Sequence, residues 1–278
     1  MTTFLLVILV AIGSLFAGLL GSLTGLGGGV VIVPLLVLVF KVDIRYAMGA
    51  SLISVIATSS GAAAAYVKEG FSNIRIGMFL EIATTLGAVL GATLAVRLPA
   101  NLISGIFGAV LLLSALISLR DWKDPAGDGP PDPLATRLRM DSTYPSLDGP
   151  RAYHVRRVPA GFGMMFGAGA LSGLLGIGSG AFKVLAMDQI MRIPFKVSTT
   201  TSNFMIGVTA AASAGIYLRR GLVVPGLAMP VVLGVILGSL IGTRVLVRTR
   251  TKWLRVIFSF VIAALGIEMI YSALTGRL

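Results

Sequence analysis

Lys183 is the residue whose type and position point most directly to chemistry, because it lies inside an apolar segment. A charge within a membrane segment is costly, so such a residue is a functional candidate by default. Lys183 would give an anion its countercharge; the alternative is that its side chain reaches an interface. Glu81 and Glu268 are further charges in apolar segments, and Arg244 is expected to reach an interface. Glu81 could take up a coupling proton, pair with Lys183 or Arg244, or itself lie near an interface.

Hydroxyl and amide side chains could serve the same anion. Residues 199–203 read Thr-Thr-Thr-Ser-Asn, and such a polar run covers every face of a helix. An unwound turn lining a cavity would explain the run, with Thr201, Ser202 and Asn203 donating hydrogen bonds to an oxyanion. Ser51, the counterpart of Ser202 in the repeat described below, would donate too. Hydrogen bonding between helices is the competing explanation.

Two glycine-rich stretches, residues 25–29 (GLGGG) and 176–180 (GIGSG), interrupt apolar runs. A helix that begins in mid-membrane presents free N–H groups and a positive dipole end, and two such ends together would form an anion site. Irregular backbone of this kind persists in a membrane only inside protein or beside a cavity. The glycines could instead be hinges or close-packing positions. The residues expected to open the two half-helices and bind the anion are Gly28, Gly29, Ser179 and Gly180.

The two stretches belong to an internal repeat with an offset of 151 residues. Sliding the chain on itself at that offset aligns further pairs without a gap. These pairs include Ser51 with Ser202, Tyr66 with Tyr217, Gly70 with Gly221, Gly87 with Gly238, Gly91 with Gly242 and Arg97 with Arg248. Interrupted segments at matching places in two halves point to the binding site of a transporter.

The composition indicates a helical membrane protein. Of 278 residues, 56% are hydrophobic and 12% are charged, and the mean hydropathy is +0.94; soluble domains carry about 25% charged residues. The absence of cysteine excludes disulfides and thiolate catalysis, and a lone histidine, His154, excludes multi-histidine metal sites. We expect no cofactor, no metal site and no enzymatic activity. The net charge of +12 suits anionic lipid or an anionic substrate, whereas nucleic acid has no soluble basic domain to bind.

The elements that would position these residues form two halves of five apolar segments each. The expected organisation is an N-terminal transmembrane repeat at 1–120, a polar linker at 121–158 and a C-terminal repeat at 159–278. Six prolines and little apolar periodicity predict a solvent-exposed, partly disordered linker. The predicted segments are 4–23, 30–40, 44–67, 74–97 and 100–119, then 160–175, 181–191, 197–218, 222–247 and 253–274.

The distribution of Lys and Arg favours opposite orientations of the two halves. If each interrupted segment turns back on itself, the linker side carries most of the basic residues, which would place the linker in the cytoplasm. If each half instead had four full spans and the halves were parallel, Lys and Arg would be divided more evenly between the two sides of the membrane. We therefore expect an all-α, multi-pass protein of the cytoplasmic membrane, built from two inverted repeats whose first two segments join at a glycine-rich break.

The sequence at 25–36, Gly-Leu-Gly-Gly-Gly-Val-Val-Ile-Val-Pro-Leu-Leu, followed by the small hydroxylated span from Ala47, resembles the TauE/SafE family of membrane transporters. The second break at 176–180 fits that family's duplicated organisation, although Ser179 stands where glycine is usual. The resemblance covers nearly the whole chain except the linker. It implies transport of small sulfur-containing anions, namely sulfite, sulfoacetate or other organosulfonates, and does not give the direction.

The resulting expectation is a secondary transporter with alternating access around a midplane anion site, with membrane lipid and a coupling ion such as H⁺ as partners. A homodimer is compatible with the sequence. An anion channel without coupled alternating access is the alternative function. An intramembrane enzyme lacks support from cysteine, intramembrane histidine or paired aspartates, and Lys183 would be hard to explain in a non-transporting scaffold.

Overall fold

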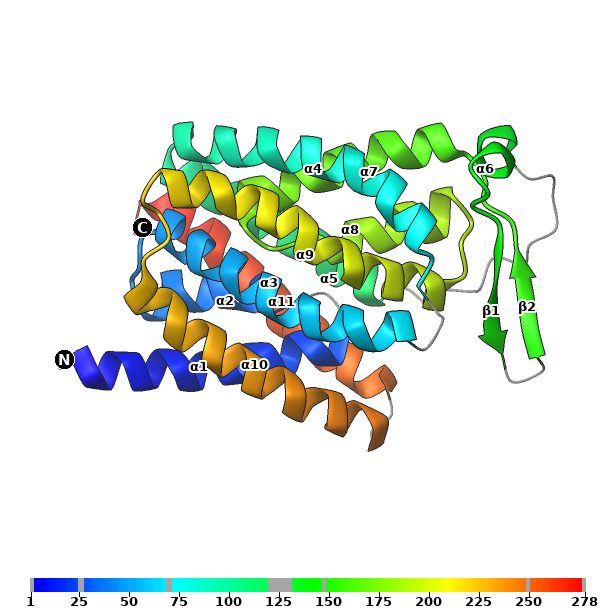
Figure 1. Ribbon diagram of the computed structural model, residues 1–278. Helices are drawn as coiled ribbons and strands as arrows, with labels where there is room; N and C mark the ends of the chain where they lie inside the picture. The colour runs from blue at the N-terminus through cyan, green and yellow to red at the C-terminus, as the bar shows by residue number, and fades with distance from the viewer. Residues whose placement is uncertain are drawn as a thin grey trace.

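The computed structural model describes residues 3–24, 28–68, 72–119, 132–146, 149–248 and 251–276. Long helices lie side by side and form one body, with α1 beginning and α11 ending at its left in Figure 1. The first half contains α1 (Thr3–Thr24), α2 (Gly29–Pro34), the π-helical turn η1 (Leu35–Val39), α3 (Ile44–Lys68), α4 (Ile74–Arg97) and α5 (Ala100–Leu119). The linker contains α6 (Pro133–Arg137), β1 (Ser142–Ser146) and β2 (Gly149–Tyr153). The second half contains α7 (Val158–Leu175), α8 (Gly180–Leu185), η2 (Ala186–Ile190), α9 (Phe195–Arg219), α10 (Pro225–Arg248) and α11 (Thr251–Thr275).

The apolar segments expected from the sequence are helical, and the predicted ranges 74–97 and 100–119 coincide with α4 and α5. Within the described ranges, α1, α4, α5 and α7 are long and apolar enough to cross a membrane. The chain is not entirely helical, however, because β1 and β2 form an antiparallel hairpin in the linker. The all-α membrane fold is confirmed for the apolar segments, and the hairpin is a small addition in the linker.

Helix packing follows the internal repeat. α1 packs against α10, and its counterpart α7 packs against α4, the counterpart of α10. α3 packs against its own counterpart α9, and α5 against α11. Exchanging the two halves therefore leaves these helix pairings unchanged, as expected for a duplicated unit.

Small residues allow the backbones of the outer pairs to approach closely. A Cβ at Gly91 of α4 would overlap the carbonyl oxygen of Ala170 in α7, and one at Gly238 of α10 would overlap that of Leu15 in α1. Without a hydrophobic driving force in lipid, helices associate through this kind of close van der Waals packing. Gly91 and Gly238, which belong to aligned glycine pairs of the repeat, thus lie on the contact faces of two helix pairs.

Part of the linker is folded against one end of the helical body (Figure 1). Its buried side chains, Ala135, Met140, Tyr153 and Val155, join a core cluster with residues from α4, α7 and α9. Asp132 accepts hydrogen bonds from Leu134 N at the start of α6 and from Val158 N at the start of α7. The described parts of 132–157 are therefore folded and anchored by these four buried side chains, while most of their other side chains are exposed, as expected. Residues 120–131 lie outside the described ranges.

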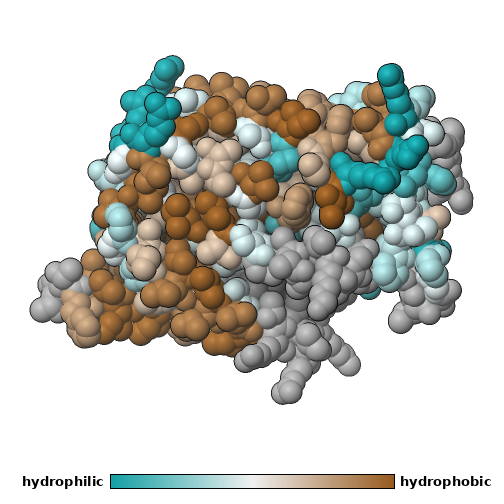
Figure 2. All heavy atoms as spheres, in the orientation of Figure 1, coloured by the Kyte–Doolittle hydropathy of each residue, from teal (hydrophilic) through white to brown (hydrophobic). Residues whose placement is uncertain are grey.

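The surface fits a membrane environment. Figure 2 shows hydrophilic residues gathered towards the two ends of the body and a largely hydrophobic region between them. Large apolar side chains such as Met78, Ile82 and Leu86 on α4 and Leu233 and Leu237 on α10 are exposed. Contiguous exposed apolar surface on this scale needs a lipid or protein partner.

Candidate functional site

The two breaks begin half-helices where the sequence predicts them. α2 begins at Gly29 with Gly28 as its N-cap, and α8 begins at Gly180 with Ser179 as its N-cap. Each short helix continues into a π-helical turn at the matching repeat position. Residues 25–27 of the first break lie outside the described ranges.

The two breaks meet in the interior. A side chain at Gly29 would lie 2.7 Å from Ser51 Oγ and 3.2 Å from the Cα of Ile177 in the second break. Gly29 is therefore a close-packing position as well as a helix start. Val31 N and Phe182 N of the two first turns donate to the carbonyl oxygens of Gly28 and Ser179. The N–H groups at the very start of a helix have no acceptor within it, so both half-helices begin with donors for other partners.

Serines join the breaks to the crossing helices. Ser51 Oγ of α3 donates to Gly176 O at 2.8 Å, and its counterpart Ser202 of α9 donates to Gly180 O at 3.4 Å. Ser179 Oγ donates to Ala168 O at 2.7 Å, and its backbone has a φ of 46°, in the left-handed region. A non-glycine residue is held there only when the surrounding structure determines it.

Lys183 lies in α8 and has no exposed surface, which excludes a side chain that reaches an interface. Its Nζ donates to Thr209 Oγ1 of α9 at 2.5 Å. The same Thr209 oxygen lies 2.6 Å from Glu81 Oε1 of α4. Thr209 of α9 thus bridges the cation on α8 and the carboxylate on α4.

Glu81 is 7% exposed, so it does not lie at an interface either. Its Oε1 also accepts from Thr85 Oγ1 at 3.2 Å, whereas Oε2 is buried without a hydrogen-bond partner. Among the described side chains, Lys183 is the one buried cation, and its partner through Thr209 is Glu81.

Glu268 is exposed on α11, and the side chain of Arg244 lies outside those described.

The polar run at 199–203 is not an unwound turn, because α9 continues through it. Thr199 and Thr200 donate to the carbonyls of Phe195 and Lys196 one turn earlier, which satisfies their hydroxyls within the helix. Thr201 Oγ1 instead accepts from Asn73 N at 3.1 Å, and Asn203 is partly exposed. Thr201 and Asn203 thus lie on a regular helix, and only Ser202 of the run bonds to a break.

The site is closed in this conformation. The exposed fractions of Ser51, Ser179, Lys183, Thr201 and Ser202 are 0%, 2%, 0%, 1% and 1%. An anion therefore reaches Lys183 only after helices separate. Asp188 of η2 is buried as well and accepts from Gln189 Nε2 at 2.7 Å.

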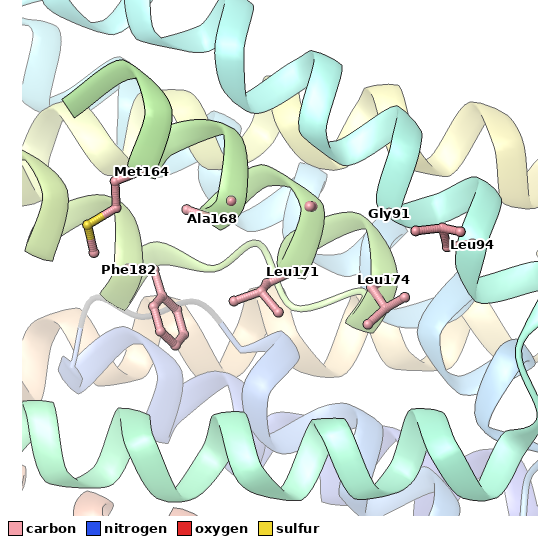
Figure 3. A pocket seen from close by; sticks show the side chains of 9 residues that line it. Gly91, Leu94, Met164, Ala168, Leu171, Leu174 and Phe182 are labelled. Atoms are coloured by element: carbon pink, nitrogen blue, oxygen red, sulfur yellow. The ribbon is translucent and has the colours of Figure 1, made fainter. Parts of the chain in front are cut away.

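A separate cavity of about 430 Å³ lies between α4, α7 and α8. Figure 3 shows apolar side chains along it, including Leu171, Leu174 and Phe182. Its lining offers no charged or hydrogen-bonding side chain, so it is not suited to an anion. Although Phe182 precedes Lys183, the lysine head group is directed to Thr209 instead.

Sequence reasoning missed Thr209 and Asn73. Thr209 is one of several small polar residues in α9, and only the fold shows that it faces both Lys183 and Glu81. Asn73 caps α4 through Ile76 N, and its Nδ2 donates to Met140 O and Tyr153 Oη of the linker. Its position directly before an apolar segment was a signal for the cap but not for the linker contacts.

Comparisons with known proteins agree with this architecture. The profile of the family described as "Sulfite exporter TauE/SafE" matches residues 10–269. The chain is 30% identical over 275 residues to the probable membrane transporter protein YunE of Bacillus subtilis, covering 96% of this chain and 98% of that protein. It is 29% identical to the probable membrane transporter protein YdhB of the same organism, covering 82% and 85%. A probable membrane transporter protein of Xylella fastidiosa is 25% identical, covering 98% and 97%.

No solved structure matches the chain. The family match extends over both halves and includes both breaks, Glu81, Lys183 and Thr209. The chain belongs to the sulfite exporter TauE/SafE family of membrane transporters.

Proposed function

We propose that this chain is a secondary transporter that moves small sulfur-containing anions across the cytoplasmic membrane by alternating access. Sulfite is the substrate that the family description names, and sulfoacetate and other organosulfonates are the related small anions that the site chemistry would also accept. The observation that carries the proposal is the fully buried Lys183, placed in the half-helix that begins at the second break. A buried cation has to be compensated, and a substrate anion is a suitable compensating group.

The anion would bind where the two breaks meet. First-turn N–H groups at Gly28, Gly29, Ser179 and Gly180 would hold its oxygens, and Lys183 would supply the countercharge. Ser51 and Ser202 would exchange their carbonyl hydrogen bonds for bonds to the anion, while Thr201 and Asn203 flank Ser202 on α9.

Inverted repeats would give such a site two equivalent routes of access. Support comes from the helix pairings, which are unchanged when the halves are exchanged. In Figure 1, α1 starts at the left end of the body and its counterpart α7 starts at the right end, beside the linker. Rocking of one half against the other would then open the crossing alternately to the two sides.

The closed conformation favours a carrier over an open channel. With Lys183 unexposed, an anion would have to wait for a conformational change at each passage, which makes flux saturable. Counterflow separates the two functions, since substrate on the trans side accelerates a carrier and does not accelerate an open pore.

The test is exchange of radiolabelled sulfite and sulfoacetate in liposomes, with sulfate and chloride as competing anions. We expect saturable exchange of the sulfur oxyanions, accelerated by trans substrate and lost in Lys183→Met, which keeps the length of the side chain without its charge. Lys196→Met is the matched control, because Lys196 is an exposed lysine of α9. Failure of both sulfur oxyanions to exchange, or full exchange in Lys183→Met, would contradict the proposal.

A further inference from the structure

The single hydroxyl proton of Thr209 has more hydrogen-bond acceptors around it than it can serve. Its hydroxyl accepts from Lys183 Nζ, and its single proton has two close acceptors, Glu81 Oε1 at 2.6 Å and Met205 O at 2.9 Å, besides the more distant Thr84 Oγ1 at 3.5 Å. With Glu81 ionised, Thr209 can donate to only one of them. Glu81 Oε2, meanwhile, is buried without a partner.

Protonation of Glu81 removes this shortage. A carboxyl group protonated at Oε1 donates to Thr209 Oγ1, which then donates its own proton to Met205 O, so the two acceptors no longer compete for one hydrogen. The chain Glu81–Thr209–Lys183 therefore has two hydrogen-bond arrangements, which differ by one proton. In the first the carboxylate compensates Lys183, and in the second Lys183 is left to compensate another anion.

Charge balance links the second arrangement to the substrate. A monovalent anion bound at Lys183 while Glu81 is ionised would leave two negative groups against one buried cation, and uncompensated buried charge is expensive. Uptake of one proton restores the balance. The number of protons taken up is the same whether the empty site holds an ion pair or a neutral lysine with a neutral glutamic acid. Both forms contain one proton fewer than the anion-bound site.

We propose that Glu81 takes up one proton when an anion binds at Lys183, so that the protein transports the proton together with the anion. This inference rests on the proposed function and assigns its coupling ion. Thr209 is the positioning residue that holds both the carboxyl group and the lysine by hydrogen bonds. Release of the anion on the other side would return Lys183 to Glu81 and release the proton there.

Few other ionisable groups bear on Glu81. The described part of α7, which packs against α4, has none. On α9 they are Lys196 near its start and Tyr217 and Arg219 near its end, and Arg75 and Arg97 lie at the two ends of α4 itself. Asp188 of η2 is bonded to Gln189. Lys183 is the charged group that acts on Glu81.

The test measures protons taken up per anion bound. Binding of isethionate and of sulfoacetate to the purified full-length protein is titrated calorimetrically in buffers with different heats of ionisation. Neither anion titrates near neutral pH, so uptake reports on the protein. For isethionate we expect about one proton per anion and an affinity that falls about tenfold for each unit rise in pH.

Glu81→Gln should take up no proton and should bind isethionate with an affinity that no longer depends on pH. Glu268→Gln, at an exposed glutamate of α11, is the matched control and should keep the wild-type uptake. Isethionate binding without proton uptake in the wild type, or unchanged uptake in Glu81→Gln, would overturn the coupling while leaving anion transport in place. Failure of the wild type to bind either anion would overturn the proposed function and the coupling together.

Discussion

Ser51 Oγ donates a 2.8 Å hydrogen bond to the carbonyl oxygen of Gly176, which ties α3 of the first half to the break of the second half. The two residues are far apart in the sequence, and Ser51 is fully buried. Gly176 itself has a φ of 69° and lies against Met48 of the same helix α3. One helix of the first repeat therefore holds the irregular backbone of the other in place.

Replacing Ser51 by alanine should loosen this contact. The carbonyl of Gly176 would lose its buried donor, and an unsatisfied buried group costs about 1–3 kcal/mol. We expect a lower thermal unfolding midpoint in detergent and reduced anion exchange. Ser60→Ala is the control, since Ser60 is exposed and bonds to Ile56 O of its own helix. Equal midpoints for the two variants would show that the contact is not needed for stability.

Thr209 should be replaceable by serine but not by valine. Valine has the same shape without a hydroxyl, so it breaks both the bond to Lys183 and the bond to Glu81. Hydrogen bonds to charged groups contribute about 1.5–3 kcal/mol each, so anion exchange should fall by about tenfold or more in Thr209→Val. Proton uptake per anion should also fall in the valine variant and persist in Thr209→Ser. Similar exchange by the two variants would argue against a bridging role.

Gly91→Ala should destabilise the α4–α7 pair. The added Cβ would overlap the carbonyl oxygen of Ala170, so the two backbones must separate. Overpacking of this kind costs about 1–3 kcal/mol, measurable as a lower unfolding midpoint. Gly167→Ala in α7 adds the same methyl group where nothing lies within 4 Å, and it should leave the midpoint unchanged or raise it slightly. A midpoint for Gly91→Ala as high as that of Gly167→Ala would contradict close packing at this crossing.

The docked linker hairpin should respond to alkaline pH. Burial raises the pKa of Tyr153 from its ordinary value of 10.0, although the hydrogen bond from Asn73 acts in the opposite direction. Because the docked form binds the phenol proton more tightly, the stability contributed by Tyr153 is complete below about pH 10 and is lost as pH rises through the raised pKa.

Hydrogen exchange around residues 140–155 should therefore accelerate above about pH 10 beyond the intrinsic effect of pH, as the ionised phenol favours undocking. Tyr153→Phe removes the titrating group and should lack this extra acceleration. Arg151→Ala, at an exposed position of the same strand, should behave as the wild type. The same excess acceleration in Tyr153→Phe would place the pH response elsewhere.

The sequence by itself determined the helices and the two breaks. Segment lengths follow from the thickness of a bilayer, and Gly28–Gly29 and Ser179–Gly180 interrupt apolar runs that would otherwise continue, so the starts of α2 and α8 could be predicted locally. The repeat offset likewise identified Ser51 and Ser202 as equivalent positions before any contact was known.

Local pattern failed where polar groups had a choice of partners. At Thr199 and Thr200 the hydroxyls bond within α9, so a run that suggested an unwound turn is a regular helix. In the linker, prolines suggested an exposed chain, and most described side chains are exposed, but Tyr153 and Val155 are buried against the helical body. Hydrogen-bond partners and burial depend on neighbouring elements, which composition does not encode.

Only the tertiary structure decided which charges meet. Glu81 was open to several partners in the sequence, and the packing of α4 and α8 against α9 places it opposite Lys183 with Thr209 between them. A buried cation and a buried carboxylate are each unfavourable alone, so their pairing is dictated by desolvation and not by spacing along the chain. That pairing is a property of three helices from both halves, and it exists only once they have packed.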